Sequence, residues 1–499
     1  MNTLILIGYF SILSVLAVYG LHRWHITRTY KKHARDVIMP LQRFTVVPKV
    51  TIQLPVFNER FVVERLIDAC AQIDYPSDNL QIQVLDDSTD DTVDLVAKRV
   101  TWWQDQGIDI VHIHRTDRSG FKAGALEAGL ASASGEFVAI FDADFVPPST
   151  ILRDTIHFFT DSGIGMVQAR WEHLNRETDT LTQVQAILLD AHFIIEHGGR
   201  CNSGKFFNFN GTAGIWRKIC IHEAGGWQHD TLTEDLDLSY RAQLAGWRFQ
   251  FLPDVTCPAE LPAGTSAFKS QQHRWAKGSI QVMLKILPKL WASNLPLKVK
   301  MEASFHLTGN IAYLLMIVNA MFFVIPAMVV RQDLDWRLVM FVDGPLFLFL
   351  SGTFIYFYMT AQKVVFKDLA GRGRYIPALM AIGLGLSVNN TRAVIEALLG
   401  HQSPFVRTPK DGGQASATSQ DYRLPINVWS FLEIGLGLFY TGAIFWAISS
   451  GTWASIPFLV LFQNGFLFMG LKTLLEARRG PKGPSQGLGG SDVAIHMNT

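Results

Sequence analysis

Acidic side chains follow a predicted strand closely enough to hold a metal ion together. Asp142 and Asp144 lie in the sequence "FDADF", at the end of the apolar run Glu136–Phe141. Side chains alternate along a strand, so both carboxylates are expected on one side of the strand end. Two carboxylates supply the oxygen ligands that Mg²⁺ or Mn²⁺ prefers, and phosphate oxygens can complete the shell. On its own the pair is weak evidence, because acidic residues also form turns and caps.

Two further acidic groups have the same ambiguity. "LDDSTDD" contains Asp86 and Asp87 at the end of an alternating run, and "TLTEDLDLS" contains Glu234 and Asp235 at the start of a helical one. The first group suits a turn. The second suits the first turn of a helix, where acids are favoured. Neither group alone identifies a reaction.

The fourth group joins a cation to an aromatic ring. "QQHRWAKG" places Arg274 beside Trp275, within the mixed basic and apolar segment Phe268–Trp291. Arginine can bind a phosphate through two N–H groups at once. The composition of the segment predicts a helix that lies in a membrane interface. A helix packed inside a globular domain is the alternative.

Strand and helix patterns alternate through the region that carries these groups. Strands are predicted at Val50–Leu54, Gln81–Leu85, Ile108–His114 and Glu136–Phe141, and helices at Phe61–Ala71, Asp91–Trp103 and Gly120–Ala133. This order predicts βαβ units and a mostly parallel sheet with helices on both faces. Ligands of such sheets bind beyond the carboxyl ends of the strands. "LDDSTDD" and "FDADF" both lie at such ends, so a nucleotide site is expected there.

Long apolar segments flank this region. Hydrophobic residues make up 48% of the 499 residues, which is high for a purely soluble enzyme. An α-helix needs about 20 apolar residues to cross a bilayer. Five segments approach that length: Met1–Leu21, Phe305–Val330, Leu338–Ala361, Trp429–Ser449 and Ile456–Leu471. The first lacks the basic start and small-residue cleavage pattern of a signal peptide, so it is expected to be a retained anchor.

Lys and Arg residues predict the orientation of the chain. They cluster after the first, third and fifth apolar segments, which places the large polar region in the cytoplasm by the positive-inside rule. Ile376–Val388 is apolar for only about 13 residues, too few for a comfortable crossing. We therefore expect five crossings and one interfacial or re-entrant element, and the crossing of 376–400 stays open. An integral protein of the plasma or inner membrane is predicted.

The net charge and the predicted domain boundaries are further properties of the sequence. A formal net charge of +1 gives no indication of nucleic-acid binding. The sequence predicts five parts: a membrane helix at 1–22, an α/β domain at 46–264, an interfacial region at 265–300, a membrane domain at 303–475 containing a loop at 401–424, and a disordered tail at 479–499.

Taken in order, the four groups resemble the D, DxD, TED and QxxRW series of membrane-embedded family 2 glycosyltransferases of the GT-A fold. These enzymes include cellulose, chitin, hyaluronan and mannan synthases, and the nearest resemblance is to plant cellulose-synthase-like mannan and glucan synthases. The stretches "QLPVFNE", "FKAGAL", "MVQARW", "FNGTAGIWR" and "EAGGW" extend it over about Val50–Gly278. The membrane part is similar in layout more than in residues.

The resemblance implies a role for each donor-site residue. Asp86 or Asp87 would contact the base and ribose of a nucleotide sugar, and Lys122 would lie near its phosphates. Asp142 and Asp144 would hold the diphosphate and Mg²⁺ or Mn²⁺.

The remaining roles concern transfer to the acceptor. Asp235 would be the general base that takes the proton of the acceptor hydroxyl, and Glu234 would help to position it. Gln272, Arg274 and Trp275 would bind the nucleotide sugar, with Trp275 also stacking at the acceptor end.

"FNGTAG" would be the acceptor-binding turn. Asn210 and Thr212 can bond sugar hydroxyls, and Gly211 lets the backbone approach a sugar closely. Trp216 suits core packing better than a sugar platform. "PFVRTPKDGG", at 404–413, resembles the gating loop of cellulose synthases, and its Thr408 and Lys410 would contact nucleotide phosphates. Arg407 departs from that pattern, and a plain basic loop is the alternative.

Three functions are compatible with these features. The first is an inverting, metal-dependent, processive glycosyltransferase that polymerises a hexose from GDP-mannose or UDP-glucose into a β-linked polysaccharide, with export across the membrane. The second is a non-processive glycosyltransferase that acts on a glycolipid acceptor such as ceramide or diacylglycerol. The third is a catalytically inactive channel or scaffold, which the intact carboxylates disfavour. Membrane lipid is an expected partner in each case.

Overall fold

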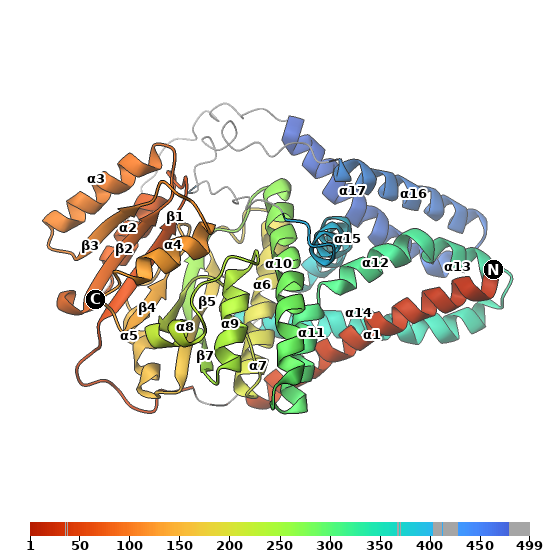
Figure 1. Ribbon diagram of the computed structural model, residues 1–499. Helices are drawn as coiled ribbons and strands as arrows, with labels where there is room; N and C mark the ends of the chain where they lie inside the picture. Colours follow the sequence, from red (N-terminus) through yellow and green to blue (C-terminus); the bar gives the residue numbers. More distant parts are fainter. Residues whose placement is uncertain are drawn as a thin grey trace.

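The computed structural model describes residues 1–34, 36, 38–366, 369, 371–402, 412 and 428–478. An α/β domain and a group of long apolar helices lie at opposite ends of the molecule (Figure 1). The domain is built on a seven-stranded sheet with the order β3-β2-β1-β4-β6-β5-β7. The strands are β1 (Val50–Val56), β2 (Leu80–Asp86), β3 (Ile110–His114), β4 (Phe137–Ile140), β5 (Ile164–His173), β6 (Gly214–Arg217) and β7 (Arg248–Ala259).

The sheet is mostly parallel, as the sequence predicts. Strand β1 is parallel to β2 and to β4, β2 is parallel to β3, and β5 is parallel to β7. Among the strands of the described residues, β6 is the one that runs antiparallel to both of its neighbours, β4 and β5. The central strands are rich in buried apolar residues because both faces of the sheet are covered. Across β1 and β2, the buried Gln53 Nε2 donates to Gln83 Oε1 at 3.1 Å.

Helices cover both faces of this sheet and leave two apolar cores. One core lies under α2 (Val63–Ala71), α3 (Thr92–Asp105) and α5 (Ile151–Thr155), and the other under α4 (Phe121–Leu130) and α9 (Glu234–Leu244). The shorter elements of the domain are η1 (Ser77–Asn79), η2 (Ile156–Thr160), α6 (Thr180–Ala191), the π-helix η3 (His192–His197), α7 (Gly198–Asn202) and α8 (Lys218–Glu223).

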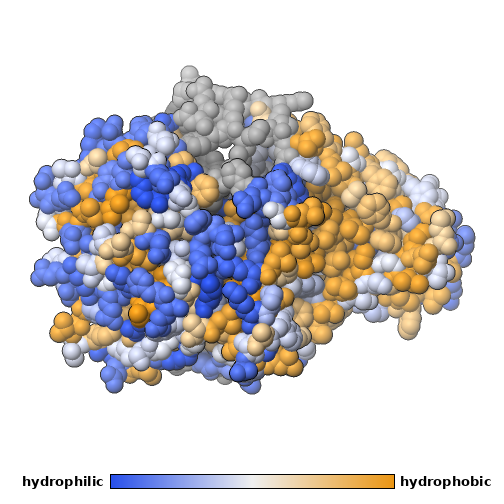
Figure 2. Space-filling model, viewed as in Figure 1, coloured by the Kyte–Doolittle hydropathy of each residue, from blue (hydrophilic) through white to orange (hydrophobic). Residues whose placement is uncertain are grey.

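The remaining helices make up the rest of the molecule, and orange surface dominates its apolar end in the face shown in Figure 2. They are α1 (Asn2–His33), α10 (Thr265–Ala292), α11 (Leu297–Thr308), α12 (Ile311–Phe322), α13 (Val324–Val330), α14 (Trp336–Phe366), η4 (Arg372–Tyr375), α15 (Ile376–Leu398), α16 (Trp429–Ser449), η5 (Trp453–Ser455) and α17 (Ile456–Arg478). In the described residues, five helical segments are long and apolar enough to cross a membrane. They are Asn2–His33, Arg337–Phe366, Arg372–Leu398, Trp429–Ser449 and Trp453–Ala477.

Two details of the predicted membrane layout need correction. The segment Phe305–Val330 is not one helix, because the chain bends by 53° between α11 and α12 and begins a further helix at Val324. The helix that starts at Ile376 continues beyond the end of its apolar run at Val388, because α15 has 23 residues and ends at Leu398. Its polar second half is satisfied inside the protein: Asn389 Nδ2 donates to the Lys269 carbonyl oxygen at 2.9 Å.

The direction of α15 supports an interfacial position. Figure 1 shows α15 nearly end-on, whereas α1, α14, α16 and α17 run across the view. Two thirds of its most apolar window is buried inside the protein, against 6% for α1 and α14. We therefore keep the interfacial placement of 376–400 as a proposal.

Helix α10 lies between the α/β domain and the apolar helices (Figure 1). Two of its lysines point into protein rather than toward lipid headgroups. Lys269 pairs with Glu433 of α16 at 2.7 Å, and Lys277 pairs with Glu396 of α15 at 3.0 Å. These buried ion pairs connect the α/β domain to the apolar helices through one continuous helix.

Candidate active site

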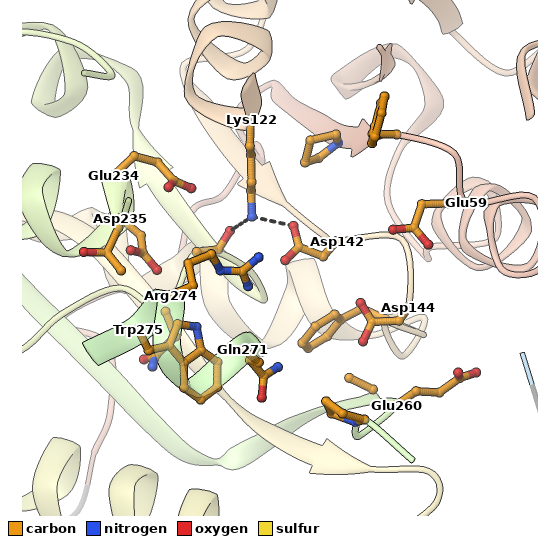
Figure 3. A pocket seen from close by; sticks show the side chains of 18 of the residues that line it. Glu59, Lys122, Asp142, Asp144, Glu234, Asp235, Glu260, Gln271, Arg274 and Trp275 are labelled. Atoms are coloured by element: carbon orange, nitrogen blue, oxygen red, sulfur yellow. Dashed lines mark hydrogen bonds and ion pairs between the residues drawn. The ribbon is translucent and has the colours of Figure 1, made fainter. Parts of the chain in front are cut away.

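A cavity lies beyond the carboxyl ends of the central strands and extends to α10 (Figure 3). Its wall is formed by strand ends, by the start of α9 and by one face of α10. The lining side chains include Glu59, Asp87, Arg118, Lys122, Asp142, Asp144, Trp171, Asn210, Glu234, Asp235, Glu260, Gln271, Arg274 and Trp275. Residues more than 200 positions apart in the sequence, such as Glu59 and Trp275, therefore meet at one site.

Lys122 of α4 lies at the centre of this site. Its ammonium group donates to Asp142 Oδ1 at 2.5 Å and to the Gly211 carbonyl oxygen at 2.9 Å. Burial lowers the pKa of Lys122, but the negative charges of Asp142, Glu234 and Asp235 outweigh it and raise the pKa overall. Lys122 therefore carries a positive charge where a diphosphate is expected to bind.

Asp142 and Asp144 both line the cavity, although strand alternation is not the reason. Strand β4 ends at Ile140, so the two carboxylates lie in the loop that follows. The loop is held because the Asp142 backbone N–H donates to Thr212 Oγ1 at 2.8 Å. The predicted role of Thr212 as a sugar ligand is not supported by its position, because its side chain is fully buried beneath this loop.

The residues present fit Mg²⁺ or Mn²⁺. Asp142 and Asp144 offer hard oxygen ligands at one wall of a cavity that also contains the Lys122 ammonium group. A cation held by few carboxylates takes its other ligands from water and substrate phosphate. Such an ion would offset the charge of a leaving diphosphate.

Glu234 and Asp235 open α9 on the opposite side of the cavity from Glu59 and Glu260 (Figure 3). Burial and the neighbouring Glu234 carboxylate raise the pKa of Asp235 to about 7. Lys122 acts in the opposite direction, but it does not cancel the effect of burial. A carboxyl group with a pKa near neutrality is suited to accept a proton at physiological pH.

The turn at Gly211 brings backbone against these charged groups. Gly211 has φ +80°, and a Cβ atom there would lie 3.0 Å from Asp235 Oδ2. Only glycine adopts this conformation readily and leaves the space open. Asn210, the preceding residue, lines the cavity. Trp216 is fully buried against Phe209, so core packing is confirmed for that ring.

One face of α10 supplies Gln271, Arg274 and Trp275 to the cavity. These residues are three and four positions apart, so they share a helical face. Gln272 is turned about 100° from Gln271 on a helix of 3.6 residues per turn. Gln271 is the glutamine that lines the cavity, and the predicted donor contact of Gln272 stays a prediction.

The two aspartates of "LDDS" have different surroundings. Asp87 lines the cavity and binds the Arg115 guanidinium through both oxygens, at 2.7 and 2.6 Å. Asp86 is fully buried and receives a hydrogen bond from His112 at 2.9 Å, with His114 at 3.5 Å. Burial opposes its ionisation, but the hydrogen bonds from His112 and Ser88 lower the pKa of Asp86 overall. Of these two candidates for the base and ribose, only Asp87 lines the cavity.

Asp86, His112 and His114 also form a group of metal-ligand type, with ligand atoms within 4.8 Å of one another. No local sequence pattern indicates this group, because the two histidines lie on the neighbouring strand β3.

Sequence reasoning also missed several lining residues. Arg118 packs its guanidinium 3.3 Å above the Phe57 ring, and Trp171 and Glu260 reach the cavity from the ends of β5 and β7. None of them belongs to a repeated or strongly acidic pattern. Thr408 and Lys410 lie outside the described residues, so their predicted phosphate contacts remain a prediction.

Comparisons with known proteins agree with this architecture. Residues 48–278 match the family model described as "Glycosyltransferase like family 2". Glucomannan 4-beta-mannosyltransferase 1 of Oryza sativa subsp. japonica is 34% identical over 444 residues, which cover 84% of this chain and 81% of the relative. Glucomannan 4-beta-mannosyltransferase 2 of Arabidopsis thaliana is 45% identical over 248 residues, 49% of this chain and 46% of the relative.

A solved structure shows the same fold. It is a mannosyltransferase from Pyrobaculum calidifontis in complex with GDP-mannose and Mn²⁺, with a TM-score of 0.50 and 20% identity. The match covers 74% of this chain and all of that structure. The chain belongs to the family 2 glycosyltransferases, among the homologues of plant glucomannan 4-beta-mannosyltransferases.

Proposed function

We propose that this protein is an inverting, metal-dependent mannosyltransferase that extends a β-1,4-linked mannan or glucomannan from a nucleotide sugar. One observation carries the proposal. A single cavity contains a carboxylate pair for a divalent cation, a buried lysine, a carboxyl group with a pKa near 7 and an arginine–tryptophan face. The names of the curated relatives point to mannose and to the 4-linkage.

The arrangement supports a single displacement. Asp235 takes the proton of the acceptor hydroxyl, whose oxygen then forms a bond to the anomeric carbon of the donor. The bond from that carbon to the phosphate oxygen breaks, and the nucleoside diphosphate leaves with the electron pair. One displacement inverts the anomeric configuration, so an α-linked donor yields a β-linkage.

Charge placement favours departure of the diphosphate. Lys122 and Arg274 both line the cavity and offer positive charge, and arginine can contact two phosphate oxygens at once. Asp142 and Asp144 would hold Mg²⁺ or Mn²⁺, which supplies further charge stabilisation when bound. Trp275 offers a flat apolar ring on which an acceptor sugar can stack.

GDP-mannose is the donor we propose, with UDP-glucose or GDP-glucose as the source of glucose units. Asp87 is positioned to contact the nucleoside part, since it lines the cavity at the end of β2. The mannosyltransferase of the same fold was solved with GDP-mannose and Mn²⁺, which makes this pair the first choice for an assay.

Processive synthesis at the membrane is the remaining part of the proposal. The cavity is lined by α10, which contacts the apolar helices directly through its buried lysines. We place the α/β domain in the cytoplasm and the product's exit among the apolar helices. The predicted gating contacts of Thr408 and Lys410 belong to this proposal.

A donor panel tests the proposal. The purified protein in nanodiscs receives Mn²⁺ or Mg²⁺ and radiolabelled GDP-mannose, GDP-glucose, UDP-glucose or UDP-N-acetylglucosamine. The expected product is a long polymer, made from GDP-mannose, that an endo-β-1,4-mannanase degrades. Label found only in a short lipid-soluble product would overturn polymerisation and favour the glycolipid alternative.

A further inference from the structure

The side-chain amide of Asn210 is held between two histidines. Asn210 Oδ1 lies 2.7 Å from His197 Nε2, and Asn210 Nδ2 lies 3.0 Å from His192 Nε2. The backbone N–H of Asn210 is fixed as well, since it donates to Gln168 Oε1 at 3.0 Å. Asn210 lines the cavity. Neither histidine belongs to the motifs that identify the glycosyltransferase site.

A π-helix makes this arrangement possible. His192 and His197 are the first and last residues of η3. On an α-helix, residues five apart point about 140° away from each other. A π-helix forms i→i+5 hydrogen bonds and has a wider turn, which brings residues five apart closer to one side. The two rings accordingly lie 4.4 Å apart, centroid to centroid.

The hydrogen bonds determine where each proton lies. His197 Nε2 is also 2.9 Å from the Asn208 carbonyl oxygen, which can only accept, so Nε2 carries the proton. The Asn210 atom facing it must then be the oxygen. Burial holds the pKa of His197 well below its usual range, so this ring is neutral.

The orientation of the Asn210 amide then determines which ring nitrogen of His192 carries the proton. Because the Asn210 amide nitrogen donates toward His192, His192 Nε2 must be an acceptor without a proton. The proton of the neutral ring therefore lies on Nδ1, where it donates to Glu196 Oε2 at 2.9 Å. Burial raises the pKa of Glu196, but Arg200 and His192 outweigh it and hold the pKa well below its usual range.

Glu196 connects this arrangement to a membrane helix. Its carboxylate lies 3.5 Å from Arg200, whose Nε donates to Glu302 of α11 at 3.1 Å. Glu302 also pairs with Lys205 at 3.3 Å and with His22 of α1 at 2.9 Å. The two-histidine contact is thus anchored by a continuous chain of charged groups.

An Asn210 amide fixed in this way presents one hydrogen-bond donor and one acceptor, each in a defined position, to the cavity. One of its two N–H groups and one oxygen lone pair are used by the histidines. The second N–H and the second lone pair stay available for a ligand. A sugar hydroxyl both donates and accepts, so it can use the two together. A rotated amide would exchange their positions.

We propose that His192 and His197 are positioning residues that fix the Asn210 amide so that it binds a hydroxyl of the acceptor sugar. This proposal rests on the proposed transfer to a carbohydrate acceptor and deepens it, because it names the two residues that orient the expected acceptor contact of Asn210. Asn210 makes the contact, and the π-helix determines the direction of the contact.

Two substitutions at one position separate positioning from packing. In His192→Gln, the side-chain oxygen reaches the place of Nε2 and can accept from Asn210. In His192→Asn, the shorter side chain reaches only the place of Nδ1 and leaves the Asn210 N–H without its acceptor. We expect His192→Asn to raise the KM for a β-1,4-mannooligosaccharide acceptor about 5- to 10-fold, the cost of one neutral hydrogen bond.

His192→Gln should stay within about twofold of wild type, and the KM for GDP-mannose should be unchanged in both variants. Equal acceptor KM values for the Gln and Asn variants, or an equal rise of the donor KM, would overturn the proposal. Asn210→Ala should raise the acceptor KM at least as much as His192→Asn.

A spectroscopic measurement decides the arrangement even if the wild-type protein transfers no mannose. Neutral histidine tautomers differ in their ¹⁵N resonances, so ¹⁵N-histidine-labelled protein in nanodiscs can be compared with its two His→Gln variants. His192→Gln should remove the signals of an Nδ1–H tautomer, and His197→Gln those of an Nε2–H tautomer. The reverse assignment would overturn the two-histidine orientation of Asn210, whereas absent transfer with the expected tautomers would overturn only the proposed function.

Discussion

The carboxyl group of Asp235 should control how the transfer rate depends on pH. Its pKa is raised to about 7, first by burial and then by Glu234. A general base works only when ionised, so activity is present above this pKa and is lost as the pH falls through it. One pH unit below the pKa, about a tenth of the carboxyl groups are ionised. The wild-type kcat/KM at pH 6 should therefore be about a tenth of its plateau.

The substitution Glu234→Gln tests whether the Glu234 carboxylate raises the pKa of Asp235. It removes the negative charge that raises the pKa of Asp235, so the acidic limb of the pH profile should move to lower pH. A movement of about one unit would raise the relative rate at pH 6 from about a tenth to about half of the plateau. Lys122→Gln removes the opposing positive charge and should move the limb to higher pH.

The assay is kcat/KM for GDP-mannose between pH 5.5 and 9 at a fixed excess of Mn²⁺. Each variant is compared with its own plateau, so a general loss of activity does not affect the result. Glu136→Gln serves as the control, since this glutamate lies outside the cavity and its side chain is 59% exposed. A wild-type profile that is flat to pH 5.5, or an acidic limb that Glu234→Gln leaves in place, would refute the reasoning.

Three further predictions follow from the site and its support. Gln271→Ala should lower kcat/KM about tenfold, because it removes one hydrogen bond to a charged group. Gln272→Ala should stay near wild type. Equal losses in the two variants would contradict the proposal that Gln271 lies on the face of α10 that lines the cavity. Lys277→Met should lower the unfolding free energy by about 3 kcal/mol, since Lys277 is fully buried against Glu396. Thermal denaturation in detergent measures this loss, with Lys298→Met at an exposed position as the control. Equal melting temperatures of the two variants would show that the Lys277–Glu396 pair contributes nothing to stability. Chelation with EDTA should abolish transfer, with recovery on addition of Mn²⁺, whereas full activity of the chelated enzyme would exclude the role proposed for Asp142 and Asp144.

The α/β domain could be predicted from the sequence because its signals are local. Each strand run is short and apolar, and each ends at a polar cluster, so the strand–helix order and the site at the strand ends follow directly. "FDADF" and "LDDS" depend only on their distance from such an end. The structure confirms the mostly parallel sheet and places Asp142, Asp144 and Asp87 at one cavity.

The sequence is least informative where a tertiary contact decides the outcome. Helix α15 continues past Asn389, whose side-chain amide donates to the backbone carbonyl oxygen of Lys269 in α10, and no local pattern indicates this contact. Thr212 is polar yet buried, because its hydroxyl is used by the loop of Asp142. The choice between Gln271 and Gln272 depends on the rotation of α10 about its axis. The π-helix at His192 adds one residue to a turn, and helical periodicity alone does not reveal this.

The central claim is that one cavity performs base-assisted transfer of mannose. The most direct measurement compares wild-type protein with Asp235→Asn for synthesis of mannanase-sensitive polymer from GDP-mannose and Mn²⁺, with GDP-mannose binding measured on the same samples. We predict that the variant binds the donor with an affinity within about threefold of wild type and loses at least about 10²-fold in polymer synthesis. Polymer synthesis by Asp235→Asn at the wild-type rate would contradict the account.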